Sequence, residues 1–260
     1  MIKEAIILAG GLGTRLRSVV ADMPKCMAPV NDQLPFIDIL LAFLKREGIE
    51  HFIFSLGYKS EIVIAHLDKT FPELFKTYVI EDEPLGTGGA IKKAIQEVKE
   101  DNVLIINGDT YFNISVKELT DLHFAKHASC TIALKELFRF DRYGSVEINA
   151  DDRITAFKEN QYCESGYING GIYLLNKSSF LQQNFADQFS FEKEFLEKST
   201  KNISGRVFSN YFIDIGIPED LNKFKNDYLQ YETDVANNND TINKSSTMLE
   251  LIGEILNSFI

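Results

Sequence analysis

The first candidate for chemistry is a glycine-rich turn near the start of the chain. Three glycines stand in the segment Gly10–Leu16 (GGLGTRL), directly after a short apolar run. Glycines let backbone N–H groups point toward an anion with no Cβ in the way, which is how such loops hold phosphates. Leu16 occupies the third glycine position of a dinucleotide-binding fingerprint, and the Gly-Lys-Ser/Thr of a Walker A loop is missing. The turn alone therefore indicates either a phosphate loop or an ordinary tight turn.

Two cations near this turn favour a phosphate loop. Arg15 lies within the turn, and Lys25 lies between two prolines in the apolar segment Met23–Pro29. A bound triphosphate needs positive charge as pyrophosphate leaves, and an Arg guanidinium suits a phosphate fork while a Lys ammonium acts as a point charge. Lys25 could equally be a solvated loop residue, so the residues leave both roles open for it.

Two aspartates follow apolar stretches and could form a cation site. Asp109 comes after Val103–Ile106, and Asp214 comes after Tyr211–Ile213. Both carboxylates can converge on the carboxyl end of a sheet, where their hard oxygen atoms suit Mg²⁺. The structural alternatives are an Asx turn for Asp109 and the N-cap of a helix beginning at Pro218 for Asp214.

The elements that must position these residues alternate along the first half of the chain. Strands separated by helical segments predict βαβ units and a parallel sheet, and the closely spaced strands after about Ser129 predict antiparallel additions over its carboxyl end. We therefore expect an α/β fold, a Rossmann-like mostly parallel mixed sheet flanked by helices. The expected strands are Ala5–Leu8, His51–Leu56, Tyr78–Ile80, Val103–Ile106, Thr131–Leu134, Ser145–Ile148, Ile154–Phe157 and Gly171–Leu175. The expected helices are Pro35–Glu47, Lys59–Leu67 and Gly89–Lys99.

Composition limits the partners of the protein. The chain has 27 basic and 38 acidic residues, a net charge of −11, which argues against nucleic acid and anionic membranes as partners. Three cysteines without CxxC spacing predict neither a disulfide framework nor a zinc knuckle. His123 and His127 have helical spacing but no third ligand nearby, so we do not expect a metal site there. The N-terminal apolar run is too short for a signal peptide or a membrane span, and we expect a cytoplasmic protein.

The C-terminal part of the chain differs from the rest. Residues 232–247 are polar and have no apolar periodicity, which predicts a linker after a domain of residues 1–231. Residues 248–260 carry apolar side chains on one helical face, and Thr247 and Glu250 have capping-box spacing. We expect this amphipathic helix to bury its face in self-association or against the core, which makes the protein a candidate homo-oligomer.

Six motifs, in order, resemble those of the sugar-1-phosphate nucleotidylyltransferases. They span nearly the whole chain except the tail. The first is Ala9–Leu16 followed by Pro24-Lys25, and the others are Glu83–Ala90, Asn107–Thr110, Tyr143–Val146, Ile168–Tyr173 and Ile213–Asp220.

The resemblance implies transfer of a nucleotidyl group from an NTP to a sugar 1-phosphate, with Mg²⁺ as cofactor. This reaction is an in-line attack on the α-phosphorus that requires mainly electrostatic help from the protein. Arg15 and Lys25 are implied as catalytic residues, and Asp109 and Asp214 as metal ligands. The implied nucleotide-binding residues are Leu8, Ala9, Gly10, Gly11, Gly13, Thr14, Pro84, Leu85, Gly86, Thr87 and Gly88. The implied substrate-binding residues are Asp109, Gly144, Lys158, Glu159 and Asn169.

Within this family the chain most resembles guanylyltransferases of D-glycero-α-D-manno-heptose 1-phosphate, so GTP and that heptose phosphate are the implied substrates. Guanylyltransferases of mannose 1-phosphate and uridylyl- or thymidylyltransferases of other hexose 1-phosphates share the motifs and remain alternatives. A non-catalytic nucleotide-sugar sensor is disfavoured because the charged residues are intact. A dehydrogenase using Asp32 as the ribose-binding acid is disfavoured by the missing third glycine.

Two positions depart from the family pattern. Cys26 follows Lys25 where the family usually has proline, and Asn160 stands where the family has a phosphate-contacting lysine. Because residues two apart in a strand share a face, we hypothesise that Lys158 supplies this cation instead. Arg139 and Arg142 are the alternatives.

Overall fold

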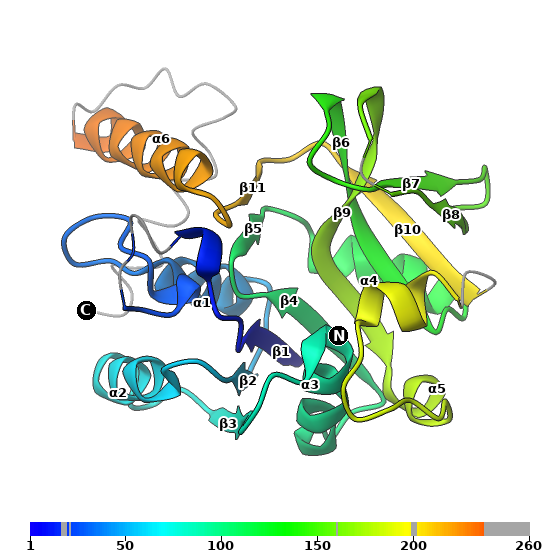
Figure 1. Cartoon of the computed structure of the whole chain (residues 1–260), viewed down its shortest axis with the longest axis horizontal. Helices are drawn as coiled ribbons and strands as arrows, with labels where there is room; N and C mark the ends of the chain where they lie inside the picture. The colour runs from blue at the N-terminus through cyan, green and yellow to red at the C-terminus, as the bar shows by residue number, and fades with distance from the viewer. Residues whose placement is uncertain (17–19, 21, 160, 199–201, 237–260) are drawn as a thin grey trace.

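A nine-stranded sheet forms the centre of the molecule, with seven strands in the order β10-β6-β9-β4-β1-β2-β3 and β7 and β8 attached beside β9 (Figure 1). The computed structural model describes residues 1–16, 20, 22–159, 161–198 and 202–236. The strands are β1 (Glu4–Ala9), β2 (His51–Leu56), β3 (Lys76–Ile80), β4 (Asn102–Asn107), β6 (Cys130–Phe140), β7 (Ser145–Ile148), β8 (Ile154–Phe157), β9 (Cys163–Asn176) and β10 (Ile203–Phe208).

The central strands are parallel, as the alternating pattern predicts. β1 pairs in parallel with β2 and β4, and β2 pairs in parallel with β3. β9 runs antiparallel to both β4 and β6, so the sheet is mixed. β10 differs from the expected antiparallel additions, because it pairs in parallel with β6. The predicted α/β fold class is confirmed.

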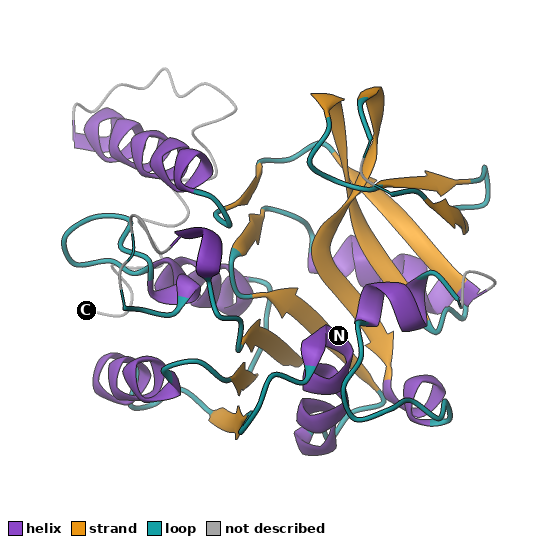
Figure 2. Ribbon diagram, viewed as in Figure 1, coloured by secondary structure: helices purple, strands orange, loops and turns teal. Residues whose placement is uncertain are grey.

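Helices flank the sheet and close two apolar cores (Figure 2). Side chains of β1 divide between the cores, since Ile7 faces one and Ile6 faces the other. This alternation explains why the central strands are apolar along their whole length. The helices are α1 (Phe36–Arg46), α2 (Ser60–Thr70), α3 (Gly86–Ala94), α4 (Val116–Ala125), α5 (Lys177–Leu181) and α6 (Pro218–Ala236). Short helical turns are η1 (Thr14–Leu16), η2 (Lys25–Met27), η3 (Ile95–Glu97) and the π-helical η4 (Phe191–Leu196). Within the described residues, none of the helices has the length and apolarity needed to cross a membrane.

A separate two-stranded sheet joins distant parts of the chain. β5 (Thr110–Phe112) and β11 (Phe212–Asp214) pair antiparallel, with Asp214 opposite Thr110. The backbone N–H of Ile215 donates to the carbonyl of Asp109 at 2.9 Å and extends this contact. The small sheet therefore brings the two predicted metal ligands to the same place.

Several boundaries differ from the sequence predictions. α3 begins at Gly86, three residues before the predicted Gly89, because its glycines pack closely against the segment around Phe189. β6 and β9 are longer than predicted and pair along Cys130–Phe140. α6 continues to Ala236, so its last residues occupy the start of the predicted linker. The predicted helix at 248–260 lies outside the described residues.

Candidate active site

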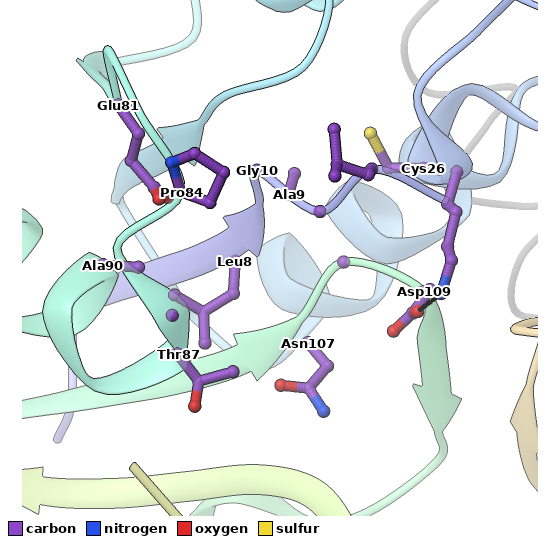
Figure 3. A pocket seen from close by; sticks show the side chains of 15 residues that line it. Leu8, Ala9, Gly10, Cys26, Glu81, Pro84, Thr87, Ala90, Asn107 and Asp109 are labelled. Atoms are coloured by element: carbon purple, nitrogen blue, oxygen red, sulfur yellow. Dashed lines mark hydrogen bonds and ion pairs between the residues drawn. The ribbon is translucent and has the colours of Figure 1, made fainter. Parts of the chain in front are cut away.

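A pocket of about 400 Å³ opens at the carboxyl ends of β1 and β4 (Figure 3). Ligands of open α/β folds bind at this edge of the sheet. The turn after β1, the segment leading into α3 and the turn after β4 form the walls. The lining residues are Leu8, Ala9, Gly10, Gly11, Leu12, Lys25, Cys26, Glu81, Pro84, Gly86, Thr87, Ala90, Asn107, Gly108 and Asp109.

The glycine-rich turn borders this pocket and requires glycine at one position in particular. Gly13 has φ of +60°, and its carbonyl accepts a hydrogen bond from the N–H of Leu16 at 3.0 Å. A Cβ at Gly13 would lie only 2.9 Å from Cγ of Lys25. Position 13 therefore requires glycine for two reasons: its backbone is in the left-handed conformation, and the Lys25 side chain passes too close to leave room for a Cβ. Arg15 lies in η1 at the same turn, with its side chain exposed.

Lys25 is directed into the pocket. It begins the short helical turn η2 after Pro24, and its ammonium donates to Oδ2 of Asp109 at 2.9 Å. The Lys25 and Asp109 side chains are only 18% and 27% exposed. Of the two roles left open by the sequence, the geometry therefore fits a cation aimed at the pocket and not a solvated loop residue.

Asp214 completes a cluster with Asp109 and Lys25. Its Oδ1 accepts a hydrogen bond from the N–H of Gly216 at 2.8 Å. Burial and the negative charge of Asp109 raise the pKa of the Asp214 carboxyl, and the charges of Lys25 and Arg15 oppose that rise. Two carboxylates that repel each other in this way are suited to a divalent cation, which would offset the repulsion. No group of three or more His, Cys, Asp or Glu side chains forms a metal cluster in the described part of the chain.

Glu81 and the start of α3 form the opposite wall. Oε2 of Glu81 accepts the N–H of Leu85 at 3.0 Å, and Oε1 accepts the hydroxyl of Ser55 at 3.3 Å. The same carboxylate lies against Gly10, where a Cβ would come within 2.6 Å of Oε1. The Glu81 side chain therefore contacts both the loop before α3 and the glycine-rich turn.

The predicted sugar-binding residues lie beyond the lining of the pocket. Asn169 is in β9, where its Nδ2 donates to the hydroxyl of Tyr173 at 2.8 Å and its Oδ1 accepts the N–H of Gly171 at 3.0 Å. Gly144 directly precedes β7 and follows Tyr143. Burial and the charge of Asp214 raise the pKa of Tyr143 to about 12. The ring of Tyr143 packs edge-on against Phe212 with centroids 6.4 Å apart, which places the Tyr143-Gly144 pair beside β11, the strand that carries Asp214.

Comparison with known proteins identifies the family of this site. Residues 4–231 match the family described as nucleotidyl transferase. The chain belongs to the nucleotidyl transferase family. It is 46% identical to a D-glycero-alpha-D-manno-heptose 1-phosphate guanylyltransferase of Aneurinibacillus thermoaerophilus, over 88% of this chain and 99% of that protein. It is 43% identical to the protein of the same name from Campylobacter jejuni, over 85% of this chain and 98% of that protein.

The structural neighbours agree with this family. The crystal structure of HddC from Yersinia pseudotuberculosis matches with a TM-score of 0.80 and 38% identity, over 87% of this chain and 100% of that one. A second HddC structure, described as complexed with GMP-PN, matches with a TM-score of 0.79. Similarity thus extends over nearly all of the chain that precedes the tail.

The nucleotidyl transferase brings only part of the predicted nucleotide-binding set to the pocket. The predicted residues that line it are Leu8, Ala9, Gly10, Gly11, Pro84, Gly86 and Thr87, together with Lys25 and Asp109. Gly88 is turned toward Phe189, since a Cβ there would lie 2.2 Å from the Phe189 ring. The carbonyl of Leu85 accepts the N–H of Phe189 at 3.0 Å, so this backbone also faces the same segment. Thr14 lies in η1 beside Arg15.

The expected position of Lys158 rests on a premise that is wrong. β8 ends at Phe157, and Lys158 and Glu159 follow it outside a regular strand. The Lys158 ammonium forms an ion pair with Glu147, and the side chain of Glu159 is exposed. Asn160 lies outside the described residues. Arg139 pairs with Glu164, and Arg142 pairs with Asp220 and lies over the ring of Tyr143.

Sequence reasoning missed Glu81 altogether, and it placed Asn107 and Gly108 in a family motif without assigning them to the pocket. Leu12, Cys26 and Ala90 also line the pocket and were not among the predicted site residues. Glu81 directly follows the predicted strand Tyr78–Ile80, and Asn107 directly follows Val103–Ile106. The carboxyl ends of parallel strands meet at one edge of the sheet. The position of Glu81 and Asn107 directly after predicted strands could therefore have placed both residues at the pocket.

The histidine pair forms no site. His123 is buried in α4, its two ring nitrogens are bonded to Thr131 and Asn102, and burial lowers its pKa to about 4. His127 lies after the helix with φ of +47°.

Proposed function

We propose that this enzyme transfers a guanylyl group from GTP to D-glycero-α-D-manno-heptose 1-phosphate, giving the nucleotide sugar and pyrophosphate. The observation that carries the proposal is the cluster of Lys25, Asp109 and Asp214 beside a pocket at the carboxyl ends of β1 and β4. The names and identities of the two guanylyltransferases described above support the choice of substrates. The expected cytoplasmic location stays a prediction.

Separate groups of residues bind the triphosphate, the base and the sugar in the proposed transfer. A phosphate oxygen of the sugar 1-phosphate attacks the α-phosphorus in line, a new P–O bond forms, and the bond to the β-phosphate breaks. Gly11, Gly13 and Arg15 bind the triphosphate, and the Lys25 ammonium stabilises charge at the α-phosphate. Pro84 to Gly88 hold the nucleotide base, and Gly144, Glu159 and Asn169 hold the sugar.

Asp109 and Asp214 would hold Mg²⁺. Two carboxylates suffice, because Mg²⁺ usually keeps several waters and takes further oxygen ligands from substrate phosphates. When bound, Mg²⁺ neutralises negative charge on the phosphate oxygens as pyrophosphate leaves. The mutual repulsion that raises the pKa of Asp214 supports this assignment.

The test is pyrophosphate release from a panel of GTP, ATP, UTP, CTP and dTTP with heptose, mannose and glucose 1-phosphates. We expect the highest kcat/KM with GTP and the heptose phosphate. A preference for mannose 1-phosphate or for UTP would replace the substrates but keep the reaction. No release with any pair, in a protein that still binds GTP, would favour a nucleotide sensor.

Glu81 supports guanine as the base. An ionised carboxylate only accepts hydrogen bonds, and guanine presents two adjacent donors, N1–H and the N2 amino group. Uracil and thymine present one donor between two carbonyl oxygens, which a carboxylate would repel. Each carboxylate oxygen of Glu81 has accepting capacity beyond its one protein partner.

Glu81→Gln is expected to lower kcat/KM for GTP about tenfold or more while changing the value for UTP less than threefold, because the amide places a donor against the guanine donors. The matched control is Glu83→Gln, which changes an exposed side chain of the same loop. An equal loss with GTP and UTP would instead mean that Glu81 acts only by holding the loop through Leu85.

Lys158 remains our proposal for the cation that contacts the phosphate of the sugar 1-phosphate. Lys158→Ala is expected to raise KM for the sugar 1-phosphate about tenfold, with KM for GTP unchanged, because two phosphates must approach each other. The control is Glu147→Gln, which removes the ion-pair partner of Lys158 but keeps the cation. An unchanged KM in Lys158→Ala would assign the contact to another cation.

We also propose that residues 248–260 associate copies of the chain. Truncation after Ala236 keeps α6 whole and removes residues 237–260, which lie beyond the family match to residues 4–231. We expect turnover within twofold of the full chain and a fall in native mass, measured by light scattering, to that of a monomer. A full chain that is itself monomeric would end the oligomer proposal.

A further inference from the structure

A carboxylate from η4 reaches the nucleotide wall of the pocket. The hydroxyl of Thr87 donates to Oε2 of Glu192 at 2.6 Å and accepts the N–H of Phe191 at 2.9 Å. Thr87 lies in the first turn of α3 and lines the pocket (Figure 3). Because its one hydroxyl proton is directed to Glu192, the orientation of its side chain is set by η4.

The backbone around this contact is packed without free space. A Cβ at Gly86 would lie 2.6 Å from the carbonyl oxygen of Phe189, and one at Gly89 would lie 2.2 Å from that of Asp187. The N–H of Gly88 donates to the Phe189 carbonyl at 3.0 Å. The start of α3 and the segment preceding η4 therefore form one unit, which Lys92 of α3 and Asp187 also join by an ion pair at 2.8 Å.

Glu192 has no cationic partner in the part of the chain that the structure describes. Its described hydrogen-bond donors are two hydroxyls, those of Thr87 and of Ser190 at 2.9 Å, both on Oε2. The described contacts of Glu192 therefore join the first turn of α3 to the start of η4 and do not serve a counter-ion.

The other neighbour of Glu192 belongs to the predicted sugar side. The ring of Tyr173 packs edge-on against Phe191 with centroids 5.2 Å apart, and its hydroxyl accepts a hydrogen bond from Asn169. Burial and the negative charge of Glu192 raise the pKa of Tyr173. The η4 turn thus connects the two sides: Glu192 and the Phe191 N–H bind Thr87, and the Phe191 ring packs against Tyr173 of the strand that carries Asn169.

We propose that Glu192 is a positioning residue of the transferase, which fixes Thr87 and the start of α3 at a set spacing from Asn169 and Tyr173 of β9. This inference rests on the proposed function, because it assigns the two walls to the nucleotide and the sugar. In-line transfer requires the attacking oxygen and the α-phosphorus to be held in register, and small displacements of either reactant lower the rate strongly. The Glu192 carboxylate holds Thr87 through its hydrogen bond, and the packing of Phe191 on Tyr173 connects the same turn to β9, while the carboxylate does not contact the reacting atoms.

The experiment compares Thr87→Val, Glu192→Ala, Glu192→Gln and the double variant Thr87→Val/Glu192→Ala. We expect Thr87→Val and Glu192→Ala each to lower kcat/KM about tenfold and the double variant to lose little more than either alone, because both remove the hydrogen bond between Thr87 and Glu192. Thr87→Val also removes the acceptor of the Phe191 N–H, and Glu192→Ala removes that of the Ser190 hydroxyl. Glu192→Gln retains an acceptor for Thr87 and is expected to stay within threefold of the parent. Glu194→Ala is the matched control, because Glu194 lies in the same turn but pairs with Lys198.

Two results would overturn the proposal. Multiplied losses in the double variant would show that Glu192 acts independently of Thr87. A Glu192→Gln variant as impaired as Glu192→Ala, with only KM for the sugar 1-phosphate changed, would show that the charge contacts the sugar directly. The affinity for GMP-PNP can be measured by calorimetry in the same four variants. This measurement tests the coupling between Thr87 and Glu192 without turnover. If the parent protein releases no pyrophosphate but this binding cycle shows coupling, the proposed function fails, whereas the contact between Glu192 and Thr87 still controls the affinity for the nucleotide.

Discussion

Replacing Asp109 or Asp214 with Asn is expected to lower the rate of pyrophosphate release by about a hundredfold or more. Asn preserves the size of the side chain and, at position 214, the oxygen that accepts the N–H of Gly216. It removes the negative charge that would hold a divalent cation between β5 and β11. The measurement is kcat with saturating GTP and sugar 1-phosphate over a range of Mg²⁺ concentrations.

The matched control is Asp151→Asn, a change at an exposed turn far from the cluster in sequence. Its turnover should equal that of the parent protein. Near-normal turnover of either cluster variant at saturating Mg²⁺ would exclude that carboxylate as a ligand.

Asp214→Asn should also stabilise the metal-free protein. Because burial and Asp109 raise the pKa of Asp214, its ionised form costs stability at pH values above that raised pKa. Asn avoids the cost, so we expect the Tm in EDTA to rise by roughly 2–4 °C, as for about 1 kcal/mol in a chain of this size. The gain should shrink as the pH falls through the raised pKa, where the parent carboxyl becomes neutral.

Lys25→Met is expected to lower kcat by about a hundredfold, the second large effect. Met keeps the apolar stem that packs against Gly13, but it removes the cation from a site of reduced dielectric. Lys25→Arg should not restore the rate, because the planar guanidinium is wider than the point charge that fits between Gly13 and Asp109. Single-turnover kinetics with bound GTP measures this effect on the chemical step.

Lys69→Met controls for loss of a positive charge, since Lys69 is exposed in the last turn of α2. It should leave the rate unchanged. A Lys25→Met variant with normal kcat and only a raised KM for GTP would limit Lys25 to binding the nucleotide.

The three central strands of the sheet could be predicted because each is mostly an apolar run. β1, β2 and β4 are buried on both faces, and burial of that kind leaves a strong signal in the residue types themselves. The turn positions that follow such strands, Gly10 and Asp109 among them, could then be assigned to one edge.

Features that depend on distant contacts could not be predicted. β5 and β11 have three residues each, too few for periodicity, and each exists because of the other. Glycines have low helix propensity, so the first turn of α3 depends on packing by Phe189 from about a hundred residues later. The contact between Thr87 and Glu192 belongs to this class, because neither residue type indicates its partner.

With Asp214 as the metal ligand proposed above, the pairing of β5 with β11 also determines when the protein can become active during its synthesis. A nascent chain that has emerged through β5 already carries the glycine-rich turn, Lys25 and Asp109, but it lacks Asp214, which is more than a hundred residues further along. Contacts at such separation form late, after local elements are in place. An unfinished chain that leaves the ribosome before β11 has been synthesised would therefore not consume GTP in the proposed reaction.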